Sequence, residues 1–563
     1  MNLFPKTVIR DSYQPSEIYG IEGNHEPSLA EHFERVDAQL YELIDSAGHG
    51  AVEVKLIFSD PLELPYFYDR DPRQPSDSYY NQSIREKNES LALAIREARR
   101  PIYEHFTEIV ENELAGQVIY ESMLTQSMII EIPHESIKEA INLTGIERIE
   151  LVEKGVIPPT IQAGRSLIGS DSYYSEYGRA VYLPIALLDT GVRTSHVLLS
   201  GVIDENYDCS TSASTCVPVT TWSDPCNHGT RSASIIAGNS SMGNPYRGMT
   251  KGYINSYNVF DAVPFPCPGS TTFYNRGMDQ AVIDGNKVIV SEVQFSSTSA
   301  NNQADSAFDT GRIVIAAAGN HPHPSAGSVS SPASAHKVLG VGAVDLGGAL
   351  YSEQRLGPTT DGRVKPDIQG VTGTWTASAA SNTATIRYPG TSGATPYAAG
   401  AAALISRRLQ KRFGIYDPGH TYAHMIAFGS RDISDSFTRN TYGAGLIQMP
   451  PLDAPFTLGK FTVGGGQTLT LNAPAVPTAS SGLTYQQIRS AIWWPKNSSA
   501  PHKNIHLTLK NPAGVAVTSS TVNGSVFQKV IGNAPLSTGV YTLEITNTSG
   551  TTQQVYFATY LIP

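Results

Sequence analysis

Four short and almost uninterrupted apolar runs lie between residues 183 and 344, separated by longer segments of mixed composition. They are LPIALLD (183–189), KVIVSEV (287–293), GRIVIAAAG (311–319) and HKVLGVGAV (336–344). Runs of this length are typical of buried parallel strands, because helices cover both faces of such a sheet. The pattern predicts an α/β fold over 181–450, with a parallel sheet flanked by helices.

The hundred residues before this stretch predict a small α+β unit, called here the front unit (51–155). Its expected strands are VEVKLIF, QVIYESM, SMIIEIP and IERIELV, and its expected helices cover 81–114, with a break at Pro101, and 134–145. The resulting β-α-β-β-α-β order is ferredoxin-like. Residues 1–50 are expected to form an N-terminal extension with one helix near 29–44, and 156–180 a polar connector.

A third pattern begins near residue 455. Runs rich in Thr and Val, such as NIHLTLKNPAG, GVYTLEITN and QQVYFATYLI, alternate with Gly, Pro and Asn turns. This predicts an all-β sandwich over 455–563, called here the β unit. Trp493 and Trp494 are expected either to form a binding surface or, for at least one of them, to pack in the core.

Charge is distributed unevenly along the 563 residues. The net charge of −11 combines about −15 over 1–160 with about +4 over 161–563, so the two parts are expected to attract each other. The sequence has no stripe of basic residues, which argues against a nucleic-acid partner. It also has no apolar run long enough for a membrane span. The first twenty residues do not resemble a signal peptide.

The four cysteines, Cys209, Cys216, Cys226 and Cys267, fall in one stretch without a CxxC pair. Their even number favours two disulfides over a zinc site. Disulfides indicate an oxidising compartment, so we expect a secreted or cell-envelope protein despite the absence of a visible signal peptide.

Four polar residues stand in local contexts that suit catalysis, although each has a simpler interpretation. Asp189 ends an apolar strand, and His228 precedes a helix of small residues beside Gly229. Ser392 opens an Ala-rich helix, and Asn320 follows a buried strand. Taken singly, Asp189 could be a turn residue and His228 a surface histidine. Ser392 could be an N-cap and Asn320 a turn amide. Together, in this chain order, they match one arrangement of a Ser-His-carboxylate set.

At these residues the chain resembles the subtilisin-like serine peptidases, the subtilases. The matching segments are Asp189-Thr190-Gly191, His228-Gly229-Thr230, Ala317-Ala318-Gly319-Asn320 and Gly390-Thr391-Ser392 through Gly400, supported by 330–345, 356–368 and 442–449. The resemblance covers about 180–450 and implies a serine endopeptidase. It implies Ser392 as nucleophile, His228 as base, Asp189 as the residue that orients the histidine, and Asn320 in the oxyanion hole.

The resemblance also implies a substrate-binding strand at VIVSEVQF, where this chain departs from the family. Ser291, Glu292 and Val293, with Ala317 and Gly319 opposite, are the expected substrate-binding residues. Val293 in place of a usual glycine is expected to narrow the approach of substrate and to alter the first specificity pocket. Arg231 and Tyr397 stand where relatives often carry histidine, which puts specificity in doubt more than chemistry.

No cofactor is expected to be needed for the chemistry. Relatives often bind structural calcium, but the loop GNSSMGNPYRG has no carboxylate, so the sequence does not support a metal site there. The end of the front unit resembles the family's propeptide, which implies an intramolecular inhibitor cut within 153–170. A permanent regulatory or structural domain is the alternative.

The expected partners are therefore polypeptide substrates and the chain's own front unit. Two other interpretations stay open: a catalytically silent binding protein with the same fold, and an adhesin whose β unit is the main functional part.

Overall fold

The computed structural model describes most of the chain, in segments separated by short gaps. These are residues 36–37, 40, 43, 50–71, 73–152, 154–155, 164–177, 184–211, 214–261, 267–320, 327–431, 436–478, 484–496 and 503–563. Most of the helix expected at 29–44 lies outside the described residues.

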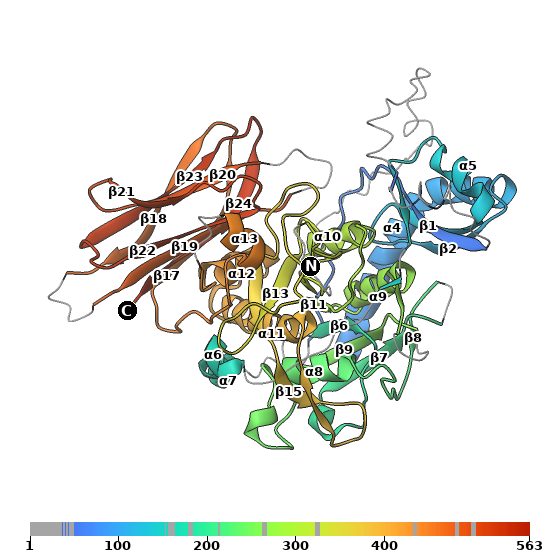
Figure 1. The fold of residues 1–563 in the computed structure, drawn as a ribbon, viewed down its shortest axis with the longest axis horizontal. Helices are drawn as coiled ribbons and strands as arrows, with labels where there is room; N and C mark the ends of the chain where they lie inside the picture. Colours follow the sequence, from blue (N-terminus) through green and yellow to red (C-terminus); the bar gives the residue numbers. More distant parts are fainter. Residues whose placement is uncertain are drawn as a thin grey trace.

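An eight-stranded sheet forms the centre of the molecule (Figure 1). Its order is β14-β13-β12-β11-β6-β9-β7-β8, and all neighbouring pairs are parallel except β7 and β8. The four apolar runs became four of its central strands, whose residues are all buried. The predicted parallel sheet is therefore confirmed. The strands are β6 (Ile185–Asp189), β7 (Ile203–Asp208), β8 (Val217–Pro218), β9 (Ile254–Asn258), β11 (Val288–Ser291), β12 (Ile313–Ala317), β13 (Leu339–Val344) and β14 (Ile368–Val371).

Helices cover both faces of this sheet, as the fold class requires. The 23-residue helix α11 (Thr391–Phe413) is buried from its first residue to Ser406 and packs against β11, β12, β13 and β14. Its small Ala and Gly side chains allow this close approach. The others in this region are α6 (Arg165–Ile168), α7 (Asp171–Tyr177), α8 (Gly229–Ala237), α9 (Thr271–Ile283), α10 (Asn301–Asp309), α12 (Pro418–Ala427) and α13 (Ser436–Tyr442), with a hairpin of β15 (Thr374–Ala377) and β16 (Thr385–Tyr388).

The front unit has the expected ferredoxin-like order. Its antiparallel sheet runs β2-β3-β1-β4, built from β1 (Ala51–Ile57), β2 (Gln117–Glu121), β3 (Ser127–Pro133) and β4 (Arg148–Leu151), with α4 (Tyr79–Asn112) and α5 (Ile137–Ile141). The predicted helix break at Pro101 is wrong, because α4 continues through it. Ile102, Tyr103 and Phe106, all buried in the turns after the proline, offset the hydrogen bond that proline cannot donate.

The β unit is a sandwich of two four-stranded antiparallel sheets, which confirms the prediction. The orders are β17-β24-β19-β22 and β18-β23-β20-β21. Trp493 and Trp494 are both almost fully buried, so neither forms an exposed binding surface. The strands are β17 (Phe456–Val463), β18 (Thr468–Val476), β19 (Gln487–Trp493), β20 (Ile505–Lys510), β21 (Ala516–Ser520), β22 (Phe527–Asn533), β23 (Gly539–Asn547) and β24 (Gln553–Ile562).

The front unit and the β unit lie on opposite sides of the central sheet, and both contribute to its hydrophobic core (Figure 1). From the β unit, the ring of Trp493 contacts Phe308 and Tyr422, with ring centroids 5.2 and 5.0 Å apart. From the front unit, Phe67, Ile95, Met123 and Leu124 are among the residues that join the same cluster. One apolar cluster therefore extends from the central sheet into both units, while the front unit and the β unit each have a further core of their own.

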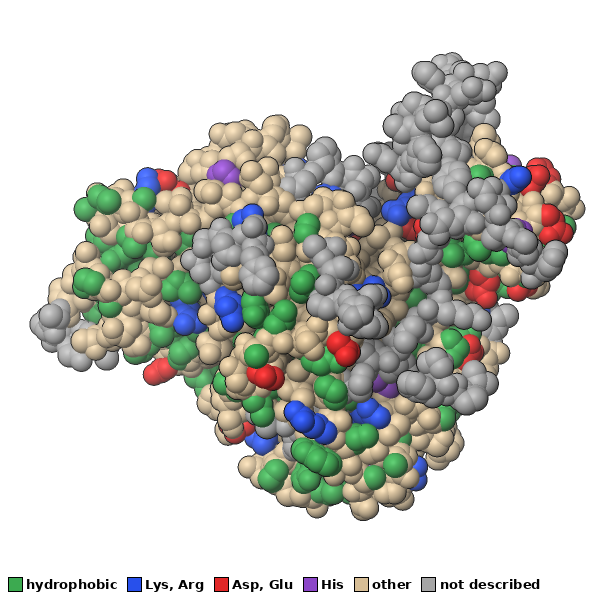
Figure 2. Space-filling model, viewed as in Figure 1, with side chains coloured by type: hydrophobic (Ala, Val, Ile, Leu, Met, Phe, Trp, Pro, Cys, Tyr) green, Lys and Arg blue, Asp and Glu red, His purple; other side chains and the backbone are tan. Residues whose placement is uncertain are grey.

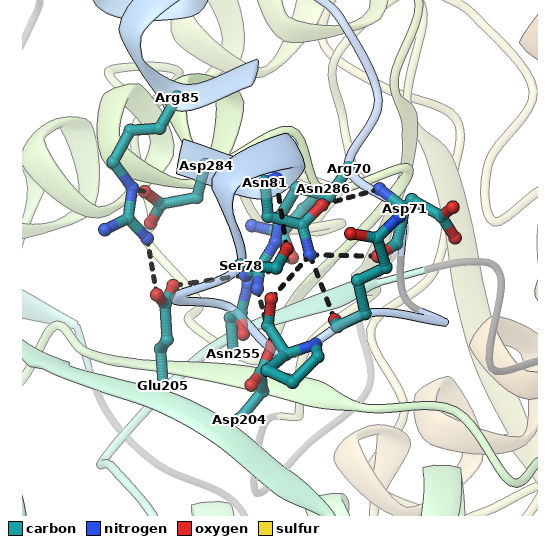
Figure 3. Close-up of polar contacts among 12 residues, drawn as sticks. Arg70, Asp71, Ser78, Asn81, Arg85, Asp204, Glu205, Asn255, Asp284 and Asn286 are labelled. Carbon is teal, nitrogen blue, oxygen red and sulfur yellow. Dashed lines mark hydrogen bonds and ion pairs between the residues drawn. The ribbon is translucent and has the colours of Figure 1, made fainter. Parts of the chain in front are cut away.

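A cluster of arginines attaches the segment around α4 to the central sheet (Figure 3). Arg70 pairs with Asp204 at 2.6 Å and with Glu205 at 3.2 Å, and Arg85 pairs with Glu205. Beside them, the buried Asn81 amide donates to the carbonyls of Asp71, Gln74 and Pro75, which fixes the turn that begins α4.

The net charges predicted that the acidic front unit would pair with cations of the central part. In most of these ion pairs the front unit instead supplies the cation. Arg312, which bonds Asp69 at 2.5 Å, is a pair in the expected direction. On the face drawn in Figure 2, acidic side chains gather at the outer end of the front unit, while Lys and Arg are scattered elsewhere. The net acidity of the front unit therefore lies partly away from its contact with the sheet.

Both predicted disulfides are present. Cys209 pairs with Cys216, and Cys226 pairs with Cys267, so the described residues contain no free cysteine and the zinc alternative is excluded for these four. The second bridge lies two residues before His228 in the sequence and ties that loop to the segment that leads into β10 (Gly269–Ser270).

None of the described helices is both long enough and apolar enough to cross a membrane.

Replacing Arg70 by Ala tests the attachment of the front unit. The arginine side chain is 4 % exposed, and its loss leaves Asp204 and Glu205 in a largely dehydrated position. We expect the free energy of unfolding to fall by about 2 kcal/mol, measured by urea denaturation of the full chain. Arg73→Ala is the control, because this side chain is 62 % exposed and its pair with Asp71 should contribute less than about 0.5 kcal/mol. Equal losses in the two variants would contradict the assignment.

Candidate active site

Asp189 and His228 meet in a buried hydrogen bond. Asp189 is the last residue of β6, and His228 is the residue directly before α8. His228 Nδ1 lies 2.6 Å from Asp189 Oδ1, and the backbone N–H of Thr190 donates to the same oxygen at 2.7 Å. Because a carboxylate only accepts hydrogen bonds, the hydrogen lies on Nδ1, and Nε2 is left as the basic nitrogen.

A second buried acid, Asp224, holds the loop that carries His228. Its carboxylate accepts hydrogen bonds from the Thr190 hydroxyl at 2.7 Å and from the Thr230 N–H at 2.9 Å. The Thr190 hydroxyl in turn accepts the N–H of Gly229 at 2.9 Å. Burial raises the pKa of Asp224. The sequence analysis missed this residue, and its only local signal is an acid four positions before the histidine.

The glycine after His228 permits the close approach of two loops. A Cβ atom at Gly229 would overlap the backbone carbonyl oxygen of Gly191. A side chain here would therefore push the histidine loop away from Asp189.

Ser392 lies in the first turn of α11 and is fully buried. Gly390, at φ +100°, turns the chain into the helix in a conformation that favours glycine. The Ser392 hydroxyl has no hydrogen-bond partner among the described residues. No hydrogen bond joins Ser392 to His228 in this structure, and the nucleophilic role of Ser392 stays a prediction.

Asn320 is held beside Ser392 with a free donor. Its side-chain oxygen accepts the N–H of Thr391 at 3.0 Å, and the N–H of Gly319 donates to the Thr391 hydroxyl at 3.2 Å. The remaining amide group, Asn320 Nδ2, is buried and has no partner among the described residues. An unpaired buried donor costs free energy unless a ligand uses it, and this one has the chemistry that an oxyanion requires.

The structure brings the expected substrate-binding residues to the same place. Ser291 ends β11 and Ala317 ends the neighbouring β12, with Ser291 in register with Ala316. Glu292 and Val293 follow directly. The side chains of Ser291, Glu292, Val293 and Ala317 are buried. Contact with substrate stays a prediction for all of them, and for Gly319.

Gln294 is a further residue that the sequence analysis did not single out. Its side-chain oxygen accepts the backbone N–H of Asn320 at 2.8 Å. A Cβ atom built on Gly319 would lie 3.0 Å from the same oxygen, so the Gln294 side chain lies between the ends of the two strands. Sequence alone gave no signal for the contact between Gln294 and Asn320, because it depends on the register of β11 and β12.

Arg231 and Tyr397, which stand where relatives often carry histidine, each contact another part of the chain. The guanidinium of Arg231 lies over the ring of Tyr388, 5.1 Å from its centre, and that ring meets His228 edge-on. The hydroxyl of Tyr397 accepts the N–H of Gly164, within the connector.

Within the described part of the chain, no three His, Cys, Asp or Glu side chains are grouped so that they could hold a metal ion.

Comparison with known proteins agrees with this geometry. Residues 183–445 match the Subtilase family. This part of the chain belongs to the subtilases. The match contains the positions of Asp189, His228, Asn320 and Ser392, and it leaves the front unit and the β unit outside.

The relatives of this subtilase are distant. Subtilisin DY of Bacillus licheniformis is 27 % identical over 296 residues, which are 52 % of this chain and 97 % of the relative. Subtilisin Savinase of Lederbergia lenta is 30 % identical over 181 residues, 32 % of this chain and 61 % of the relative. The subtilisin-like proteinase Mp1 of Magnaporthiopsis poae is 29 % identical over 255 residues, which are 44 % of this chain and 58 % of the relative. This subtilase thus has homologues among the serine peptidases.

Among solved structures, a mutant of the epidermin leader peptide processing serine protease of Staphylococcus aureus aligns with a TM-score of 0.49 at 16 % identity. The alignment covers 71 % of this chain and 98 % of the other. Because this likeness is weak, the fold is assigned from the strand order of the central sheet itself.

Proposed function

We propose that this protein is a serine endopeptidase that hydrolyses peptide bonds in polypeptides through Ser392, His228 and Asp189. The observation that carries the proposal is the buried hydrogen bond of 2.6 Å between His228 and Asp189, on the same sheet edge as an unpaired Asn320 amide and Ser392. Such a set has the parts that acyl transfer needs: a nucleophile, a base, an orienting acid and an oxyanion donor.

The chemistry follows from these positions. His228 Nε2 takes the proton of Ser392 while the Ser392 Oγ forms a bond to the substrate carbonyl carbon. Asp189 keeps the hydrogen on Nδ1 and stabilises the imidazolium. Asn320 Nδ2 donates to the oxyanion, and His228 then gives its proton to the leaving amine as the C–N bond breaks. Water releases the acyl group by the same steps, and no cofactor enters.

We also propose that the described form is a resting one. Asp189, His228 and Ser392 are each at most 1 % exposed. Substrate must reach Ser392, so something must move before turnover. β5 (Lys154–Gly155), at the end of the front unit, pairs with β10 on the central part of the chain. We infer that the front unit is an inhibitory propeptide whose end runs along the substrate path.

The two disulfides also bear on where the protein works. Disulfides persist in oxidising compartments and are rare in the cytosol. We therefore propose that the protein acts outside the cytosol, as a secreted or cell-envelope enzyme.

Removing the nucleophile and the oxyanion donor tests the reaction. Ser392→Ala should abolish labelling by a fluorophosphonate probe and hydrolysis of casein. Asn320→Ala should keep labelling but lower kcat by about 10²–10³, because one oxyanion donor is lost. Ser381→Ala, at an exposed serine, is the control and should change neither. If the wild-type chain takes no label after its front unit is removed, the silent binding protein is the better interpretation.

Self-processing tests the propeptide assignment. Purified active protein should begin within 153–170, whereas Ser392→Ala should remain a full-length chain of 60.6 kDa. N-terminal sequencing and intact mass measure both. A fully active enzyme that keeps residues 51–155 covalently attached would instead support a permanent front domain.

Gln294 gives a prediction about specificity. Because its side chain lies between the ends of β11 and β12, it should limit the substrate residue before the cleaved bond to small side chains. Gln294→Gly should shift cleavage in a peptide library towards larger apolar residues at that position. Gln448→Gly, at a half-buried glutamine outside the site, is the control. An unchanged preference in Gln294→Gly would contradict this role.

A further inference from the structure

Several buried polar atoms beside the catalytic residues have no partner, and the mechanism above does not use all of them. Both carboxyl oxygens of Glu292 and the second oxygen of Asp189 are buried without hydrogen bonds to described residues. The Ser392 hydroxyl is likewise buried without a hydrogen-bond partner among the described residues. An unpaired carboxylate is unfavourable inside a protein, so the protonation state of Glu292 needs an explanation.

The strand register places the two acids side by side. β6 and β11 are parallel neighbours, with Leu188 in register with Ser291, and the N–H of Glu292 donates to the carbonyl of Leu188 at 3.1 Å. One position further along, Asp189 ends β6 and Glu292 directly follows β11. The charge of Asp189 acts on Glu292, so the two carboxyls lie close together.

None of the groups that surround Glu292 is a permanent cation. They are Asp189 at the end of β6 with its partner His228 before α8, Ser392 on α11 and the phenol of Tyr388 on β16, while Ala317 ends the neighbouring β12. The guanidinium of Arg231 is stacked on Tyr388, and Glu292 forms no ion pair with another described residue. An ionised Glu292 would therefore be a second buried anion beside Asp189.

The electrostatics agree with this geometry. Burial and the neighbouring Asp189 raise the pKa of Glu292 well above its ordinary value, and the Ser392 hydroxyl offsets only part of that rise. The un-ionised form of Glu292, a carboxylic acid with one O–H to donate, is thereby favoured over the carboxylate.

We propose that Glu292 is a positioning residue that works as an un-ionised acid, and that its ionisation sets the alkaline limit of activity. As an acid it can donate to Ser392 Oγ and leave the serine hydrogen directed at His228. As a carboxylate it can only accept, and it competes with His228 for that same hydrogen through a charge-assisted bond. This inference rests on the proposed function of Ser392.

The pH profile of kcat/KM tests the role in the processed enzyme, with each profile normalised to its own maximum. The wild type should lose activity as Glu292 ionises, whereas Glu292→Gln, which cannot ionise, should lack that alkaline limb. Two pH units above the wild-type midpoint, the variant should retain at least about tenfold more of its maximum. Glu353→Gln, at an exposed glutamate, should keep the wild-type profile. Superimposable profiles of wild type and Glu292→Gln would overturn the proposal.

Thermal unfolding tests the protonation without any catalysis, in chains that also carry Ser392→Ala. In the unfolded chain Glu292 ionises with a pKa of ~4.3, and in the folded chain it does so at higher pH. Stability due to this group is therefore complete below the lower value and is lost as pH rises towards the higher one. Glu292→Gln should gain in unfolding temperature relative to its parent as pH increases above about 5.

A constant difference in unfolding temperature across pH would show that Glu292 ionises normally, and would overturn the inference. If the thermal result is as expected but the wild type shows no Ser392-dependent cleavage, the proposed function fails and the role assigned to Glu292 fails with it. The two causes of failure are thereby separated.

Discussion

The site at the edge of the central sheet depends on one buried contact, the hydrogen bond from His228 Nδ1 to Asp189. An ionised carboxylate without water around it is unfavourable, so its oxygens must be satisfied by donors that the fold supplies. The N–H of Thr190 and the imidazole meet this need for one oxygen. Asp224, Thr190 and Thr230 then fix the loop from which the imidazole comes. Much of the local structure around α8 serves to hold this one ring in place.

The same sheet edge also holds groups whose needs are not met within the described protein. The Asn320 amide, the Ser392 hydroxyl and the Glu292 carboxyl are buried and unpaired. A fold that only had to be stable would pair or replace them, since each unsatisfied group costs free energy. Polar atoms kept in this state at the carboxyl ends of parallel strands are typical of a site built for a ligand or a transition state.

Sequence alone predicted what depends on local pattern and missed what depends on register. The apolar runs predicted the parallel strands, and the strand-helix order predicted the ferredoxin-like front unit. Pro101 was misread, because burial of the residues after it outweighs the local preference against proline. Asp224 and Gln294 were missed, because each acts on a residue from another loop or strand. The direction of the ion pairs at α4 was also missed, since net charge says nothing about which side chains face the contact.

The packing of Trp493 against Phe308 and Tyr422 bears on how this chain can be divided. A β-sandwich at the end of a chain invites excision as a separate module. Here its tryptophan belongs to the interior of its neighbour, so a chain shortened at the boundary would present aromatic rings to water. Such a fragment would be prone to aggregate, and a loss of activity in it would report damage to the scaffold rather than the absence of a binding partner.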